Sequence, residues 1–217
     1  MKVRVRKVER LQQELSHVYW LVGPPCAGKS SLADALVATY GWQLYRCDDR
    51  YEYHASIATL ELQPTFSKIT RLSSEAFWMR PLALQLCEKI QAYQEEFPLI
   101  LADLLAFSKT KPVVVEGSAL LPGLLAPLLS SPHQAFGLVP TPAFQVKCYL
   151  QRGWVKELVA KASGPEQTFA LWMQRNVHFA AFVAQEALAH GVLAIQVDGS
   201  RSLEEHMKMV EQHFHLI

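Results

Sequence analysis

The chain has 217 residues, of which half are hydrophobic and 19% are charged, and its formal net charge is +1. A composition this rich in apolar residues excludes disorder over most of the chain and allows one domain with a substantial core. The near-zero net charge excludes a strong electrostatic field that would attract nucleic acid or an anionic membrane.

The first residues, MKVRVRKVER, form a basic run that we interpret as a solvated arm or a first strand. The first apolar run, at residues 18–22, is too short for the core of a secretory signal. No run reaches the ~18 apolar residues that a membrane span needs. Cys26, Cys47, Cys87 and Cys148 are far apart and lack metal-ligand spacing. We therefore expect a reduced, cytoplasmic protein.

The first half of the chain predicts strands that alternate with helices. Residues 18–22 predict a short buried strand, and residues 30–40 predict a helix that stops at Gly41, where the glycine is typical of a helix end. Residues 42–46 predict a second strand. Residues 74–97 have helical periodicity.

The second half continues the alternation. Residues 112–117, PVVVEG, are rich in β-branched side chains and predict a central parallel strand that is buried on both faces. Residues 143–150, AFQVKCYL, predict a fourth strand. A long helical region follows, with a break near residues 163–165. Residues 193–199 predict the last strand, and residues 202–214 predict a final helix that opens with a capping box.

Strands that alternate with helices predict a parallel sheet whose two faces are covered by the connecting helices. The sequence contains five predicted strands and no linker rich in proline, glycine or serine. We therefore expect residues 1–217 to form a single α/β domain.

Residues 23–30, GPPCAGKS, fit the pattern G-x-x-x-x-G-K-[ST] between a predicted strand and a predicted helix. A phosphate chain needs such a tight loop of backbone N–H groups and the positive N-terminus of the following helix. Lys29 would reach the terminal phosphates, and the Ser30 hydroxyl would bind Mg²⁺. The simpler alternative is a turn with a chance lysine. The residues expected to bind polyphosphate are Gly23, Pro24, Pro25, Cys26, Ala27, Gly28, Lys29, Ser30 and Ser31.

Acidic residues follow the second predicted strand and end the third, at the edge of the sheet where ligands bind in open parallel sheets. Asp48 and Asp49 could hold Mg²⁺ through water, accept a proton from an acceptor hydroxyl or hydrogen-bond an acceptor. Arg50 and His54 could contact an anionic acceptor. Glu116 could orient water on Mg²⁺ or act as a base. The alternatives are a solvated acidic turn and a capping acid.

Positively charged residues follow the fourth predicted strand. Arg152, Lys156, Lys161 and Arg175 could neutralise charge during phosphoryl transfer from a mobile lid at about residues 151–176. Each lysine taken alone fits a solvated helix face better than a catalytic role. Arg152 is the preferred lid cation because it begins the segment, and Arg175 is a second cation or a surface residue.

Two features lie near the C-terminus. The loop VDGSRS, which contains Gly199, could contact the base and ribose of a nucleotide or form a simple turn. His213 and His215 have no further metal ligands near them in the sequence, and we interpret them as tail residues.

Together these motifs resemble the P-loop kinases of small molecules, a group with nucleoside monophosphate kinases, shikimate and gluconate kinases and chloramphenicol phosphotransferase. The resemblance rests on GPPCAGKSS, CDD, VVVEG, the arginine at position 152 and VDGS, which occur in that order. It implies a P-loop NTPase three-layer sandwich with a helical lid, and ATP with Mg²⁺ as the donor. The residues that would then act in catalysis are Lys29, Asp48, Glu116 and Arg152, with Ser30 and Asp48 at the metal and Gly199 at the nucleotide.

The segment 55–111 would shape the acceptor pocket in such an enzyme, with Pro81 starting or kinking a helix within it. Arg71, Trp78 and Arg80 could line that pocket, although Trp78 would equally fit the core and the arginines the surface. The sequence lacks the D-G-F-P-R stretch of adenylate kinases. The residues expected to bind the acceptor are Asp48, Asp49, Arg50, Arg80 and Arg175.

Three functions are consistent with these motifs. The first is transfer of the ATP γ-phosphoryl group to a small hydroxyl metabolite or nucleotide. The second is a nucleotide-binding switch or ATPase that acts through a protein partner, and the third is phosphate binding without chemistry. For the first function we expect a small-molecule acceptor, no nucleic acid or membrane partner, and a monomer or homodimer.

Overall fold

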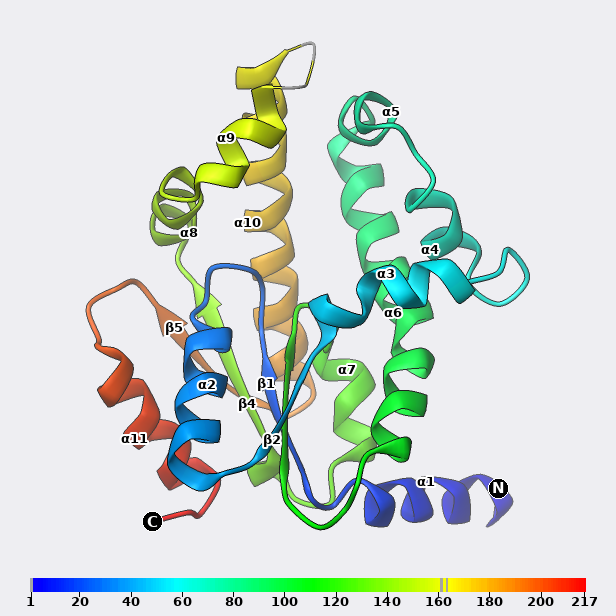
Figure 1. The fold of residues 1–217 in the computed structure, drawn as a ribbon, viewed down its shortest axis with the longest axis vertical. Coiled ribbons are helices and arrows are strands. Elements are labelled where there is room, and N and C mark those ends of the chain that lie inside the picture. The colour runs from blue at the N-terminus through cyan, green and yellow to red at the C-terminus, as the bar shows by residue number, and fades with distance from the viewer. Residues whose placement is uncertain (1, 161, 163) are drawn as a thin grey trace.

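The computed structural model describes residues 2–160, 162 and 164–217. Five parallel strands form one sheet in the order β2-β3-β1-β4-β5 (Figure 1). The strands are β1 (Val18–Val22), β2 (Gln43–Arg46), β3 (Val113–Gly117), β4 (Ala135–Pro140) and β5 (Leu193–Val197). The predicted five-stranded parallel sheet is confirmed, and β1 lies at its centre.

The central strands are buried on both faces, because alternate side chains enter different cores. Val113 and Val115 of β3 pack in one cluster, whereas Val114 packs in the other. Trp20 and Leu21 of β1 divide in the same way. A run of consecutive apolar residues therefore gives a strand here, since each face of the sheet receives every second side chain.

Helices cover both faces. In chain order they are α1 (Lys2–Glu14), α2 (Lys29–Tyr40), α3 (Cys47–Ile57), α4 (Pro64–Ile69), α5 (Ser74–Trp78), α6 (Leu82–Ala106), α7 (Pro122–Leu125), α8 (Pro142–Leu150), α9 (Gly153–Ala160), α10 (Pro165–Ala189) and α11 (Leu203–His213). Two 3-10 turns, η1 (Ala126–Leu128) and η2 (Pro132–Gln134), follow α7. The buried clusters place α2 and α11 on one face and α6, α7 and α10 on the other, so the predicted three layers are confirmed.

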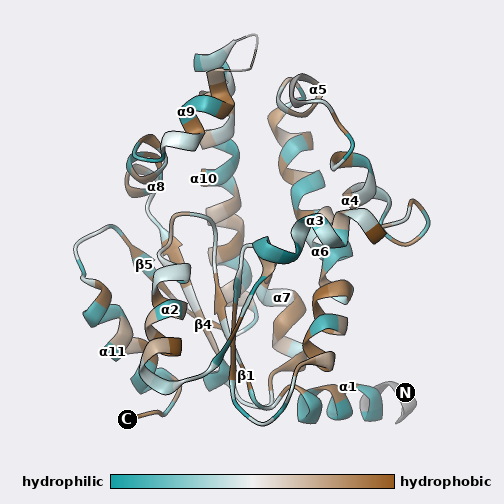
Figure 2. Cartoon of the chain, in the orientation of Figure 1, coloured by the Kyte–Doolittle hydropathy of each residue, from teal (hydrophilic) through white to brown (hydrophobic). Residues whose placement is uncertain are grey.

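The apolar sides of these helices face the sheet. Figure 2 shows the strands as mostly hydrophobic and several of the helices as mixed. Above the carboxyl ends of the strands, α8, α9 and the first half of α10 stand opposite α5 and the start of α6 (Figure 1). A cluster that includes Cys26, Trp78, Tyr149 and Trp172 joins the elements at this end. The candidate site lies here.

The predicted strand at residues 143–150 is wrong, because this segment is helix α8. Thr141 caps the helix by accepting a hydrogen bond of 3.3 Å from the N–H of Phe144, and Pro142 occupies the first turn. Both are strong signals for a helix start. The fourth strand is Ala135–Pro140, where Gly137 and Pro140 obscure the strand pattern.

Two other regions differ from expectation. The basic N-terminus is neither an arm nor a strand but helix α1, which Gln12 ties to the carbonyls of Pro127 and Leu129. The predicted helix at residues 74–97 divides into α5 and α6, and Pro81 is the N-cap of α6, so it starts a helix as expected. Within the described part of the chain, no helix is long and apolar enough to cross a membrane.

Candidate active site

The loop between β1 and α2, residues 23–28, has the backbone shape of a phosphate-binding loop. Gly23 has φ +144°, and a Cβ at that position would lie 2.0 Å from the carbonyl oxygen of Leu138, so only glycine fits. Gly28 has φ +85°, and a Cβ there would meet no atom within 4 Å, so the front of the loop is open at this residue. Helix α2 begins directly behind this opening, and its first N–H groups have no partner within the helix.

Lys29 is folded back across this loop. Its side chain is buried, and its Nζ donates a hydrogen bond of 2.9 Å to the carbonyl oxygen of Pro24. Burial lowers the pKa of Lys29, while the nearby carboxylates of Glu116 and Asp48 act in the opposite direction. A polyphosphate anion bound at this loop would favour the charged form of Lys29.

Ser30 and Glu116 meet at the end of β3. The Oγ of Ser30 donates a hydrogen bond of 2.9 Å to Oε1 of Glu116, and the Nε of Arg46 lies 3.7 Å from the same oxygen. Burial raises the pKa of the Glu116 carboxyl. The charge of Lys29 and the hydrogen bond from Ser30 partly offset this increase. A hydroxyl and a carboxylate oxygen are the ligand types that Mg²⁺ prefers.

The carboxylate that contacts Ser30 is therefore Glu116 rather than Asp48, which the sequence paired with Ser30 as metal ligand. The structure instead places Asp48 in the wall of a separate cavity. Asp48 is still close enough to raise the pKa of Lys29. Its predicted role at the metal stays a prediction.

A cavity of about 430 Å³, which we call the P-loop cavity, opens beside the loop. Residues of the loop, of α2, β4, α8, β5 and α11, and of the segments after α8 and β5 line it: Cys26, Ala27, Gly28, Ser31, Leu32, Leu138, Phe144, Cys148, Gln151, Arg152, Val197, Gly199, Arg201, Leu203 and His206. The predicted nucleotide residue Gly199 and the predicted lid cation Arg152 thus meet the loop at one cavity. Sequence reasoning missed Arg201 and Phe144, although Arg201 lies in the VDGSRS stretch.

Arg152 reaches this cavity from the end of α8, so its predicted position after a strand is corrected. Its guanidinium lies 5.4 Å from the centre of the Tyr149 ring. It is also close enough to Cys26 to lower the pKa of that thiol, although burial dominates and raises it to about 11. Arg152 is thus the cation of this segment that stands next to the loop.

A second cavity of about 260 Å³, the helical cavity, lies between α3, α4, α6 and α10. Its walls are Cys47, Asp48, Tyr51, Phe66, Ile69, Phe77, Arg80, Gln85, Glu88, Lys89, Ala92, Tyr93, Glu96, Ala119 and Arg175. Three of the five predicted acceptor residues, Asp48, Arg80 and Arg175, therefore come together here. The volume lies near the lower limit of ligand pockets, which suits a compact molecule.

Arg80 is neutralised within this wall. It forms an ion pair with Glu88, which also accepts a hydrogen bond of 2.8 Å from Lys68. Its guanidinium lies 5.0 Å from the centre of the Phe77 ring.

Arg175 and Lys89 lack such a partner. Arg175 is buried against the Phe77 and Trp78 rings, 5.5 and 4.9 Å from their centres. Lys89 lies 4.6 Å from the centre of the Phe179 ring, and its polar contact, with Asn176, is long at 3.5 Å. Among the described residues, no carboxylate oxygen lies within 4 Å of either cation.

Arg175 is buried and Lys89 is half-buried, and among the described residues neither cation has a carboxylate partner that would offset its desolvation. A cation over an aromatic ring gains about 0.5–2 kcal/mol. Desolvation of an ion in a protein costs several kcal/mol. Burial accordingly lowers the pKa of Lys89 and of Arg175, and Arg175 lowers that of Lys89 further. Sequence reasoning missed Lys89, whose position on α6 carries no local motif.

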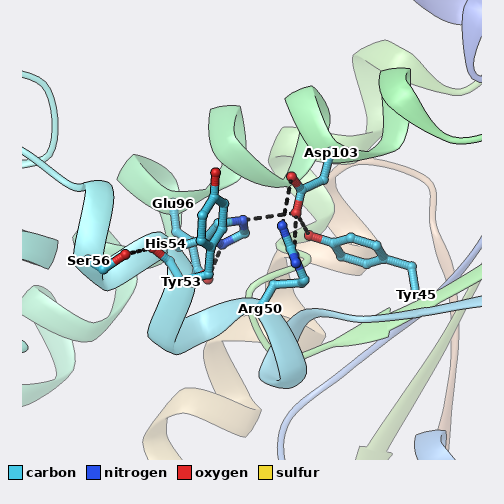
Figure 3. Close-up of polar contacts among 7 residues, drawn as sticks. All are labelled: Tyr45, Arg50, Tyr53, His54, Ser56, Glu96 and Asp103. Carbon is cyan, nitrogen blue, oxygen red and sulfur yellow. Dashed lines mark hydrogen bonds and ion pairs between the residues drawn. The ribbon is translucent and has the colours of Figure 1, made fainter.

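Asp49 and Arg50 do not line the helical cavity, and their predicted contact with the acceptor stays a prediction. They turn away from Asp48 because the three residues follow one another on the first turns of α3. Arg50 binds Asp103 of α6, with its Nε 2.8 Å from Oδ2 (Figure 3). Asp49 is exposed beside this pair.

His54 is part of the same contact between α3 and α6, which we call the Asp103 network. It is fully buried, with Nδ1 3.0 Å from Glu96 and Nε2 3.2 Å from Asp103 (Figure 3). Tyr45 donates a further hydrogen bond of 2.9 Å to Asp103. Burial alone would raise the pKa of Asp103, but the hydrogen bonds from these donors outweigh it and lower that pKa. His54 thus joins α3 to α6, and its predicted contact with an acceptor stays a prediction.

The remaining predicted residues are placed as follows. Trp78 is buried against Trp172 and Arg175, whereas Arg71 and Lys156 are exposed. Lys161 lies outside the described residues.

The C-terminal histidines are not simple tail residues. The Nε2 of His213 lies 2.9 Å from the carbonyl oxygen of Ala135, and its ring packs near His133 and Phe136. Within the described ranges, no three side chains of the metal-binding types form a metal site.

No protein-family profile matches the sequence. No curated protein matches it either. Among solved structures, shikimate kinase from Acinetobacter baumannii in complex with shikimate is similar with a TM-score of 0.52 and 15% identity, covering 94% of this chain and 98% of that one. A protein from Thermus thermophilus has a TM-score of 0.49 and 16% identity, covering 90% and 96%. The chain has the fold of the P-loop small-molecule kinases, as the first comparison shows.

Proposed function

We propose that the protein is a phosphotransferase that moves the γ-phosphoryl group of ATP to a hydroxyl group of a small molecule. One observation carries the proposal. Lys29 and the Ser30–Glu116 pair lie at the phosphate loop, whose residues Gly28 and Ser31 line the P-loop cavity. Asp48 is close enough to Lys29 and Glu116 to influence the pKa of both, and it lines the second cavity of about 260 Å³. The charged groups of the phosphate loop thus lie near an acid of the acceptor-sized cavity.

The residues of the phosphate loop and the Ser30–Glu116 pair fit ATP and Mg²⁺. The loop offers backbone N–H groups and an open front at Gly28, which suits phosphate oxygens. Ser30 and Glu116 supply the oxygen ligands, directly or through water, that Mg²⁺ requires. When bound, Mg²⁺ would neutralise charge on the phosphates.

The side chains divide the chemistry among them. Lys29 stabilises negative charge on the transferring group, and Arg152 adds charge from the side of α8. Asp48 accepts the proton of the acceptor hydroxyl as its oxygen bonds to phosphorus. The bond from the γ-phosphorus to the bridging oxygen breaks at the same time, and ADP leaves with the electron pair. The apolar wall of the helical cavity limits access of water to the phosphoryl group.

The same cavity argues against a nucleotide switch that works through a protein partner. A switch needs no enclosed second site beside the phosphate loop. A binder without chemistry would need neither the Lys29 contact across the loop nor the buried acid at Ser30.

The proposal is tested by measuring ADP release with Mg-ATP in the presence of pooled acceptors. The pools are nucleoside monophosphates, nucleosides, sugar acids, and alcohols of the aminoglycoside or chloramphenicol type. Lys29→Ala should reduce the stimulated rate about 10³-fold or more, because electrostatics dominate phosphoryl transfer. Lys156→Ala removes an exposed lysine of α9 and is the matched control.

Mass spectrometry should find a phosphorylated acceptor in the reaction of the wild type. Full activity in Lys29→Ala would exclude the proposed role of the loop. Slow ATP hydrolysis at the same rate with every pool, without a phosphorylated product, would favour the switch instead.

A further inference from the structure

The charges around the helical cavity do not pair off among themselves. Glu88 is shared between Arg80 and Lys68. Glu96 faces His54. Asp48 is the third carboxylate of the wall, and it has no ion pair in the described part of the chain.

Among the described cations in the wall of this cavity, Arg175 and Lys89 are the two that have no ion pair. They come from α10 and α6, two helices that pack together, and both line the cavity. The Nε of Arg175 is buried without a hydrogen-bond partner in this part of the chain. Lys89 and Arg175 lie close enough to repel one another, so each makes the other more costly in the empty cavity.

Aromatic side chains fill much of the remaining wall. Phe77 lies under Arg175, and Tyr51, Phe66 and Tyr93 form other parts of the surface. An anion that enters among these rings loses its water, and two fixed cations then bind it more strongly than they would at the surface.

We propose that the phosphoryl acceptor carries an anionic group, a carboxylate or a phosphate monoester, which Arg175 and Lys89 bind together. Its hydroxyl group then lies toward Asp48, and a compact apolar body spans the aromatic wall between the two ends. This inference rests on the proposed function, because it names the class of molecule that the same site takes. It excludes neutral alcohols as the natural acceptors.

The first test measures binding without catalysis. Benzoate, benzamide and inorganic phosphate are titrated while tryptophan fluorescence is recorded, since Trp78 packs against Arg175. Benzoate or phosphate should give a saturable change in the wild type, and benzamide, which lacks the charge, should give none. Arg175→Met and Lys89→Met should each weaken the response at least tenfold.

Two controls accompany this titration. Lys208→Met removes an exposed lysine of α11 and should leave the response unchanged. Lys29→Ala identifies phosphate that binds at the P-loop, because only that fraction of the signal should disappear. Thermal melts confirm that each variant folds. An absent response in the wild type, an equal response to benzamide, or an equal response in both methionine variants would overturn the inference.

The second test separates this inference from the proposed function. Pools of hydroxy acids, of their carboxamides and of hydroxylated phosphate monoesters are compared for stimulated ADP release. Acids or monoesters should be active and carboxamides inactive, and Arg175→Met should raise the KM for the acceptor at least tenfold with the KM for ATP unchanged. Carboxamides as active as the acids would overturn the inference while the kinase proposal stands. Anion binding that depends on Arg175, without phosphorylation of any pool, would support the inference and contradict the kinase proposal.

Discussion

The Oγ of Ser30 and the Oε1 of Glu116 are 2.9 Å apart, although 86 positions separate the two residues in the sequence. The contact joins the first turn of α2 to the carboxyl end of β3, and it brings an acid to the phosphate loop. It arises because β1 and β3 are neighbours in the sheet, with Leu21 paired to Glu116. We therefore expect the negative charge of Glu116 to be needed for binding Mg²⁺.

Glu116→Gln tests that role. The amide keeps the size of the side chain but removes the negative charge, so we expect about a 10²-fold loss of stimulated ADP release and a higher Mg²⁺ requirement. The measurement is the rate as a function of Mg²⁺ concentration at saturating ATP. Glu204→Gln, which neutralises an exposed acid of α11, is the control. A normal Mg²⁺ dependence in Glu116→Gln would exclude Glu116 from the metal site.

Asp48→Asn tests the proposed base. We expect the rate with acceptor to fall by about 10²- to 10⁴-fold, because the amide cannot take the proton, while ATP binding stays unchanged. The adjacent Asp49→Asn is a matched control, since Asp49 lies outside the helical cavity. Single-turnover rates and an ATP titration measure the two effects separately. Equal losses in both variants would contradict the assignment.

Arg152→Met tests the cation at the P-loop cavity. The variant keeps an unbranched apolar stem but removes the charge, and we expect about a 10²-fold lower kcat with a small change in the KM for ATP. Lys156→Met, four residues further along the chain and exposed, should have near-normal activity. If the KM rises and kcat is unchanged, Arg152 serves only to bind nucleotide.

Asp103→Asn tests the contact between α3 and α6. Asp103 accepts hydrogen bonds from Tyr45 and Arg50 and faces His54, and its side chain is 20% exposed. Hydrogen bonds to a charged group contribute more than those between neutral groups, so we expect about 2–3 kcal/mol lower free energy of unfolding. Urea denaturation at pH 7 measures it. Unchanged stability would show that the network contributes little.

The same variant has a predicted pH dependence. The pKa of Asp103 is lowered in the folded state, so its contribution is complete above the unfolded value of about 3.9 and is lost as the pH falls through the lower folded value. The difference in unfolding free energy between wild type and Asp103→Asn should therefore shrink below about pH 4. Urea denaturation from pH 7 down to pH 3 measures this difference. A difference that stays constant over that range would contradict the lowered pKa.

Much of the fold could be predicted because its signals are local. The pattern of Gly23, Gly28, Lys29 and Ser30 occupies eight consecutive residues. The β-branched run of β3 predicts that this strand is buried on both faces. The error at residues 143–150 was also local. Their apolar residues suit a strand or a helix, and the cap at Thr141 with Pro142 decides for the helix.

The site was predictable only where a strand end or a motif marked it. Asp48 lies just after β2 and Glu116 at the end of β3, so their approach to the loop could be expected. Arg50 and Asp49 share the sequence neighbourhood of Asp48, but the helical turn points them elsewhere. Lys89 had no signal, because an isolated lysine in an amphipathic helix is typical of a solvated surface.

The sequence by itself determined the phosphate loop, the alternation of strands and helices, and the acids at the sheet edge, because each depends on neighbouring residues. Only the tertiary structure decided which acid meets Ser30, that Arg50 and His54 serve the Asp103 network, and that Arg175 and Lys89 enter one cavity. These relationships join residues far apart in the chain. Strand order and helix packing set their distances, and the local pattern of residues does not contain that information.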